Sequence, residues 1–250
     1  MSDSIDRVTP TLRPDGRVVQ RPGWHELTFL HWPVPVAMLR PLVPAALEID
    51  TFEGSAFIGL VPFTMMRVRP WWAPPLPGIT NFHETNVRTY VHRAGRDPGV
   101  WFFSLDAASL LATYAARTLW HLPYHHARMS LEKADGEVRY GSERLRPPPT
   151  PAACHVTVRP RGEPAAARVG TLEYFLAERY LLYATTADGQ LRRGAVHHAP
   201  YPLQPVDVLA CEESCIAAAG ITRPSGPPPL AHYASKVEVE IFALARLAAG

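Results

Sequence analysis

Residues 81–93, NFHETNVRTYVHR, are the stretch that most directly predicts the fold. Aromatic and β-branched residues recur through it, and this composition favours an extended strand. Glu84 and Arg88 lie four residues apart, so both side chains point to the same face of that strand. Because this spacing spans about 13 Å of extended chain, the two groups form no direct ion pair unless a β-bulge brings them closer. Composition alone favours a solvent-facing pair.

Further strands are predicted on both sides of this stretch. They cover residues 24–32, 56–69, 100–105, 124–132, 136–142, 154–160, 180–185, 191–197 and 235–243. Short helices are expected within residues 33–44, 107–119 and 171–178, and another at 208–219, which Gly220 would end. Many strands with few short helices predict a mainly antiparallel α+β or barrel-like fold.

The 250 residues suit one large domain built around a shared core. Residues 1–22 are polar and interrupted by proline, and we expect them to form an arm over the surface. Residues 23–250 are then a single domain. Its two halves are expected to join near residues 144–153, RLRPPPTPAA, where proline stiffens the connection.

The formal net charge is +2, from 25 basic and 23 acidic residues, which argues against a nucleic-acid or membrane-surface partner. No apolar run approaches the roughly eighteen residues that a membrane span needs. Three cysteines form no disulfide framework, and the start lacks the pattern of a signal peptide, so we expect the reduced cytoplasm. Cys211 and Cys215 would share one face of the helix predicted at 208–219, as buried small side chains.

Three groups of polar side chains interrupt the apolar segments. They are Glu84 with Arg88, the histidine- and tyrosine-rich HLPYHHARM at 121–129 that follows Arg117, and His25 with Glu26. Histidine titrates near neutral pH and tyrosine can donate or accept a proton, so general acid–base chemistry is open to them. No carboxylate or cysteine spacing completes a metal-binding set, and GxGxxG, GxxxxGK[ST], HExxH and GxSxG are absent. We therefore expect neither a metal nor a cofactor.

These segments resemble an uncharacterised family known as DUF2071 or YqjF-like proteins. The resemblance rests on LTFLHWPVPVAMLRPLVPAALEID at 27–50, GITNFHETNVRTYV at 78–91, LPYHHARM at 122–129 and LEYFLAERYLLY at 172–183. That family is in turn similar to the acetoacetate decarboxylase-like superfamily, as in LRPLVPAALEID beside the decarboxylases' LRxxVPxPLEID. The resemblance implies an antiparallel β-barrel with a few short peripheral helices around an interior pocket.

Carried over residue by residue, the resemblance also implies where a site would lie. Glu84 matches the pocket glutamate of the decarboxylases, and Arg117 matches the arginine of their GRE motif. Tyr124 stands in place of the lysine that forms their Schiff base, and His125 in place of the lysine next to it. His25 matches a substrate-binding arginine.

Imine formation needs a nucleophilic amine, which Tyr124 lacks. The two lysines of the chain, Lys133 and Lys236, lie in a predicted turn and in the last predicted strand, away from the matching position. The resemblance therefore supports the fold and argues against decarboxylation through a Schiff base.

The first functional hypothesis is an enzyme without a Schiff base. Glu84, Tyr124 and His125 would converge as catalytic groups and move protons on a small carbonyl compound or carboxylic acid. Positive charge for binding this substrate would come from the basic candidates, His25, Arg88 and Arg117. The reaction type stays open among lyase, isomerase and hydrolase.

Two alternatives stay open beside the enzyme. In one, the pocket is a non-catalytic binding site for a small apolar or acidic metabolite. In the other, Glu84 and Arg117 form a buried structural ion pair and aromatic side chains fill the pocket. The superfamily resemblance is also compatible with a homo-oligomer.

Overall fold

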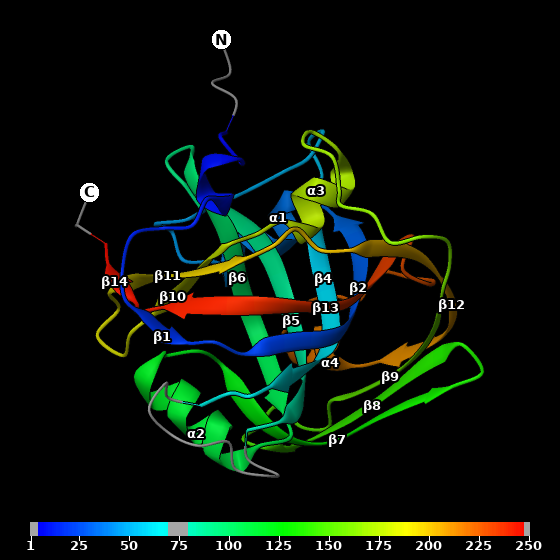
Figure 1. The fold of residues 1–250 in the computed structure, drawn as a ribbon. Helices are drawn as coiled ribbons and strands as arrows, with labels where there is room; N and C mark the ends of the chain where they lie inside the picture. Colours follow the sequence, from blue (N-terminus) through cyan, green and yellow to red (C-terminus); the bar gives the residue numbers. More distant parts are fainter. Residues whose placement is uncertain (1–4, 70–79, 248–250) are drawn as a thin grey trace.

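The computed structural model describes residues 5–69 and 80–247. One 14-stranded sheet makes up most of it (Figure 1). In chain order its strands are β1 (Val18–Gln20), β2 (Gly23–Val34), β3 (Glu48–Ile49), β4 (Ala56–Met66), β5 (Phe82–Arg93), β6 (Arg96–Ala107), β7 (Tyr124–Ala134), β8 (Glu137–Arg146), β9 (Ala153–Pro160), β10 (Leu181–Thr185), β11 (Leu191–His198), β12 (Leu203–Glu213), β13 (Leu230–Phe242) and β14 (Ala245–Arg246). The helices are short: α1 (Val36–Leu39), α2 (Leu110–Leu119), α3 (Leu172–Ala177) and α4 (Cys215–Ala218), with 3₁₀ turns at Thr9–Thr11 and Arg40–Leu42.

The sheet is large and curved, and its hydrogen-bonded ladder closes on itself. The path runs β6-β7-β8-β9-β12-β13-β2-β4-β5, and β5 then pairs with β6. The mainly β class with a few short helices is thus confirmed. The pairing is not antiparallel throughout, because β6 runs parallel to both β7 and β10.

The central strand β5 is buried along most of its length, and the solvent-facing interpretation of Glu84 and Arg88 was wrong. Glu84 is 3% exposed and Arg88 is 8% exposed. The physical reason is the curvature of the sheet, which leaves neither face of β5 open to water. One core cluster contains Phe82 and Phe63, and another contains Val87 and Leu60.

Two tight turns form hairpins in the sheet, one after β5 and one after β7. Ala94 and Gly95 connect β5 to β6, and Asp135 and Gly136 connect β7 to β8, all four with positive φ. Two-residue turns of this kind match the right-handed twist of the paired strands. As a result β6 begins at Arg96, four residues before the strand predicted at 100–105.

The helix predicted at 208–219 is wrong. Residues 203–213 form β12, which lies between β9 and β13, and only the four residues of α4 are helical. Hydrogen bonding to β9 on one edge and to β13 on the other stabilises the strand more than the weak helix propensity of these residues stabilises a helix. Cys211 therefore lies on a strand and Cys215 in α4, so they share no helix face; Cys215 is fully buried and Cys211 half-buried.

The N-terminal segment contacts the sheet directly, since β1 pairs with β13. The proline-rich residues 144–153 connect β8 to β9, which are antiparallel neighbours. Figure 1 shows α2 and α3 at opposite ends of the curved sheet. No helix among the described residues is long and apolar enough to cross a membrane.

Candidate functional site

A cavity of about 220 Å³ lies inside the curved sheet, and α2 forms one of its walls. Most of its lining is apolar and includes Trp24, Phe63, Phe82, Phe102, Leu105 and Trp120. The polar lining comes from Glu84, Asn86, Arg88, Tyr124, Arg179 and Tyr201, together with Gln20 and Tyr180. A few polar groups in a mostly apolar hollow are typical of a small-molecule site.

Three of these polar groups lie on the face of strand β5 that lines the cavity. Glu84, Asn86 and Arg88 are alternate residues, and all three line the cavity. The predicted shared face of Glu84 and Arg88 is thus observed. The register with β6 shifts between Val87 and Arg88, yet no ion pair joins Glu84 to Arg88 in the described structure.

Glu84 and Tyr124 meet across the intervening strand β6. Glu84 is the register partner of Ala107 in β6, and Tyr124 is the partner of Leu105 two residues before it. The Tyr124 hydroxyl donates a 2.7 Å hydrogen bond to Oε2 of Glu84. The pairing of three neighbouring strands therefore fixes the contact between the two side chains.

Burial changes the ionisation of both groups. Removal from water raises the pKa of Glu84 to about 8; the hydrogen bond from Tyr124 opposes this rise, and the charge of Asp106 adds to it. Burial also raises the pKa of Tyr124 well above its ordinary value, with smaller contributions from Glu84. At neutral pH both groups therefore carry a proton.

Two arginines line the cavity toward α3. Arg88 Nη2 donates to the carbonyl of Leu176 at 3.2 Å, and Arg179 Nε donates to the carbonyl of Phe175 at 2.6 Å. Carbonyls in the last turn of a helix have no partner within the helix, so the end of α3 is suited to hold both guanidinium groups. Arg88 Nε and Arg179 Nη2 remain buried without a hydrogen-bond partner within the described structure.

The charge around these arginines is only partly balanced. Arg179 forms an ion pair with Asp50 at 2.8 Å, whereas Arg88 pairs with no carboxylate of the described residues. Arg88 instead faces the rings of Phe29 and Tyr90 at 5.6 and 5.7 Å. A buried cation with an unused N–H group favours an anion beside it.

His125 does not join Glu84 and Tyr124, contrary to expectation. It follows Tyr124 directly on β7 and therefore points to the opposite face of the sheet. Its Nδ1 lies 2.9 Å from the carbonyl oxygen of Pro147, and the ring lines a separate open groove of about 760 Å³. Burial lowers the pKa of His125, which keeps the ring neutral near pH 7.

Arg117 and His25 also lie outside the cavity. Arg117 is an exposed residue of α2, lines the same groove as His125, and donates a 2.7 Å hydrogen bond to the backbone carbonyl of Tyr124. His25 is half-buried, while its neighbours Trp24 and Leu27 line the cavity. The register of β2 shifts after His25, and Glu26 has a φ of 56°, which marks a β-bulge. This bulge turns the side chains of Trp24 and Leu27 toward the cavity.

These positions overturn the hypothesis of a buried structural pair. No ion pair joins Glu84 and Arg117 in the described part of the chain, and the cavity is not filled by aromatic rings. Both lysines are exposed and line neither hollow. Within residues 5–69 and 80–247, no three His, Cys, Asp or Glu side chains gather as metal ligands would.

Sequence reasoning missed Asn86, Arg179 and Tyr201. Arg179 had a detectable signal, because Glu178 and Arg179 are two charged residues inside the apolar run LEYFLAERYLLY. Asn86 lies between Glu84 and Arg88 on the same face of β5 and could have been inferred by alternation. For Tyr201 the sequence carries no such signal, since it lies in a turn between β11 and β12.

Comparisons with known proteins agree with this architecture. The model of DUF2071, described as an uncharacterized conserved protein, matches residues 21–238. Uncharacterized protein YqjF of Bacillus subtilis (strain 168) is 42% identical over 231 residues, which cover 92% of this chain and 93% of that protein.

Solved structures show the fold. Acetoacetate decarboxylase from Legionella pneumophila is 12% identical with a TM-score of 0.61, over 98% of each chain. The enduracididine biosynthesis enzyme MppR, complexed with pyruvate, is 11% identical with a TM-score of 0.62, over 94% of this chain and 91% of that chain. The chain therefore belongs to the DUF2071 family, with a fold similar to that of the acetoacetate decarboxylase-like enzymes.

Proposed function

We propose that this protein is an enzyme that acts on a small oxo acid, using Glu84 as proton donor to the carbonyl oxygen of the substrate. The observation that carries the proposal is the buried Glu84–Tyr124 pair inside a cavity that also contains two arginines. Small-molecule enzymes of similar fold support this class, and in MppR the bound molecule is pyruvate, itself an oxo acid.

The chemistry follows from the protonated state of Glu84. When a C–H bond next to a carbonyl breaks, its proton passes to water, and when a 3-oxo acid loses its carboxylate, CO₂ leaves. In both cases the electron pair left on carbon moves onto the carbonyl oxygen and forms an enolate. A neutral carboxyl group neutralises this charge by transferring its proton to the oxygen, which gives the enol, and it takes the proton back when the carbonyl forms again. The hydrogen bond from Tyr124 to Oε2 orients the carboxyl and strengthens it as a donor.

Arg88 and Arg179 would bind the carboxylate of the substrate. Arg88 Nε and Arg179 Nη2 are the buried N–H groups without partners, and both arginines line the cavity. Arg88 and Glu84 lie at two points along β5, so a ligand with a carboxylate at one end and a carbonyl at the other fits this arrangement. Because both lysines are exposed, the proposal involves no imine.

The test follows proton nuclear magnetic resonance spectra in D₂O for three acids: pyruvate, acetoacetate and 4-oxopentanoate. In this series the carbonyl moves one carbon further from the carboxylate at each step. We expect deuterium exchange next to the carbonyl of at least one of them, or loss of CO₂ from acetoacetate, faster than in buffer alone. The rate should fall as pH rises through about 8, where Glu84 loses its proton.

Substitutions test whether the reaction rate depends on the proton of Glu84. Glu84→Gln keeps the size of the side chain but has no proton to transfer, and should lower the rate about a hundredfold. Glu143→Gln, at an exposed ion pair, is the matched control and should keep the wild-type rate. If a Glu84→Gln, Tyr124→Phe double variant keeps the wild-type turnover, the assignment of Glu84 as proton donor is wrong.

The second candidate is a non-catalytic binding protein for the same acids. The unpartnered N–H groups of Arg88 and Arg179 would serve such a protein equally well. Saturable binding of the acids, with no exchange and no turnover in any of them, would establish this alternative. We also propose a reducing, cytoplasmic location, because the three cysteines are unpaired.

A further inference from the structure

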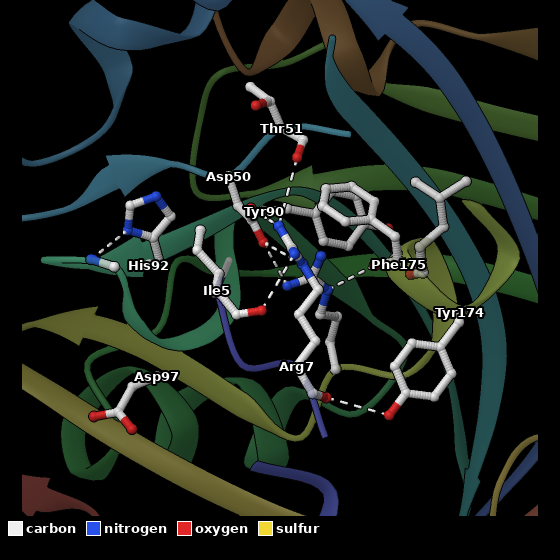
Figure 2. Close-up of polar contacts among 12 residues, drawn as sticks. Ile5, Arg7, Asp50, Thr51, Tyr90, His92, Asp97, Tyr174 and Phe175 are labelled. Atoms are coloured by element: carbon white, nitrogen blue, oxygen red, sulfur yellow. Dashed lines mark hydrogen bonds and ion pairs between the residues drawn. The ribbon is translucent and has the colours of Figure 1, made fainter. Parts of the chain in front are cut away.

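The N-terminal segment brings a charged side chain into the interior beside the cavity. Arg7 forms an ion pair with Asp50, which is 1% exposed, and its guanidinium lies 5.2 Å from the centre of the Phe175 ring. Its backbone carbonyl accepts a hydrogen bond from the hydroxyl of Tyr174 at 3.2 Å. Figure 2 shows Arg7 between Asp50 and Thr51 on one side and Tyr174 and Phe175 on the other.

Asp50 is shared between Arg7 and Arg179. Arg7 contacts Oδ1 through Nη2 and approaches Oδ2 through Nε at 3.3 Å. Arg179 contacts Oδ2 alone, through Nη1 at 2.8 Å. A guanidinium and a carboxylate otherwise prefer two parallel hydrogen bonds, and Arg7 occupies the oxygen that a second contact from Arg179 would use.

We propose that Arg7 is a positioning residue for the ligand site, which keeps Nη2 of Arg179 available to an anionic ligand in the cavity. Without Arg7, both oxygens of Asp50 would be free to bind Arg179, and the N–H group that has no partner would turn away from the cavity. The proposal rests on the proposed function in one respect, that the ligand is an acid.

The positive charge of the arginines near Asp50 also favours an anionic ligand. Arg7 and Arg179 share the carboxylate of Asp50, and Arg88 lies near the same Tyr90 ring as Arg179. The nearby Glu178 accepts hydrogen bonds from Tyr180 and from the backbone of Tyr201, and burial raises its pKa. Removing Arg7 removes one positive charge from this group, which also weakens the attraction for an anion.

The segment carries its own matched control. Arg13 forms an ion pair with Glu240 and lies 5.4 Å from the centre of the Phe242 ring. It thus attaches the same segment by the same two kinds of contact, but at the surface and away from Arg179. Replacing Arg13 loosens the segment without changing the partners of Asp50.

The experiment compares the affinity of an acid with that of its neutral amide, by titration calorimetry on the full chain at neutral pH. The probes are 3-phenylpropionate and 3-phenylpropionamide, which have the same shape and no reactive carbonyl. We expect wild-type protein to prefer the acid, Arg7→Met to lose about tenfold of that preference, and Arg13→Met to keep it. Arg7→Lys should retain most of the preference, because an ammonium at Oδ1 still blocks the second contact.

The outcomes are separable. If Arg7→Met weakens acid and amide equally, or keeps the preference of wild type, Arg7 is only structural and the inference is wrong. If wild-type protein binds acid and amide equally, the anionic ligand itself is wrong, and the proposed function fails with it. If Arg7→Met does not fold, Arg7→Gln, which also removes the charge, is the second test, with the same expected loss of preference and the same results against the inference.

Discussion

Glu84 lies among apolar side chains on β5, and its removal from water raises its pKa to about 8. The hydrogen bond from Tyr124 reduces this rise without cancelling it, because the hydroxyl stabilises the ionised carboxylate less than water does. A residue that composition alone assigns to the surface is thus buried and stays protonated at neutral pH. The identity of the residue was readable from the sequence, but its protonation state was not.

The same pKa predicts how stability depends on pH. In the unfolded chain Glu84 loses its proton near pH 4.5, whereas in the folded chain it keeps the proton up to about pH 8. Between these values the folded state binds more protons, so the free energy of unfolding decreases as pH rises. Glu84→Gln stays neutral and should gain stability relative to wild type over this range, by on the order of 3–5 kcal/mol.

Urea unfolding at about pH 5 and about pH 8 measures this difference. Glu143→Gln serves as control, since that carboxylate is exposed and should follow the wild-type curve. If the free energy of unfolding changes equally between the two pH values in wild type and in Glu84→Gln, Glu84 is ionised in the folded protein at neutral pH.

At the scale of elements, strand alternation decides which neighbouring residues share the site. On β7, Tyr124 faces the cavity and His125 faces the open groove, although the sequence placed both at the matched pocket positions. On β2, the bulge at Glu26 turns Trp24 and Leu27 inward and leaves His25 outside. Motif matching locates the element, and the pleat and the bulge then choose the face.

Helix α2 supports the start of β7 through Arg117. Its guanidinium donates to the carbonyl of Tyr124, across the short connection between the two elements. Arg117→Gln should destabilise the fold by about 1 kcal/mol, because the hydrogen bond is partly exposed. Under the proposed function it should also lower kcat by a larger factor than it raises KM. Thermal unfolding and a comparison of kcat with KM check this. Arg128→Gln, at an exposed pair with Glu143, should change neither.

At the scale of the whole molecule, closure of the sheet creates the interior in which the site lies. Because β5 pairs with β6, strands from both ends of the chain surround one cavity. On the other face of the sheet, Arg144 of β8 and Asp106 of β6 form a buried pair with contacts at 2.7 and 3.1 Å. Cys215 of α4 lies 3.6 Å from the same carboxylate. This pair joins strands on either side of β7.

Loss of this buried pair should affect the entire fold. Asp106→Asn leaves Arg144 without a carboxylate at a position where both side chains are 1% exposed. We expect a loss of about 3–5 kcal/mol in the free energy of unfolding, measured by urea denaturation. Asp207→Asn, which breaks an exposed pair with Arg161, is the control and should cost about 1 kcal/mol or less. Equal losses in the two variants would contradict the structural importance of the Asp106–Arg144 pair.

The sequence by itself determined the mainly β class, most of the strand positions and the shared face of Glu84 and Arg88. These properties depend on composition and on the two-residue period of a strand, which are local. Only the tertiary structure decided that residues 203–213 pair as a strand, that Arg179 and Tyr201 join the cavity, and that His125, His25 and Arg117 do not. Those outcomes depend on sheet closure, bulges and burial, which act between residues far apart in the chain.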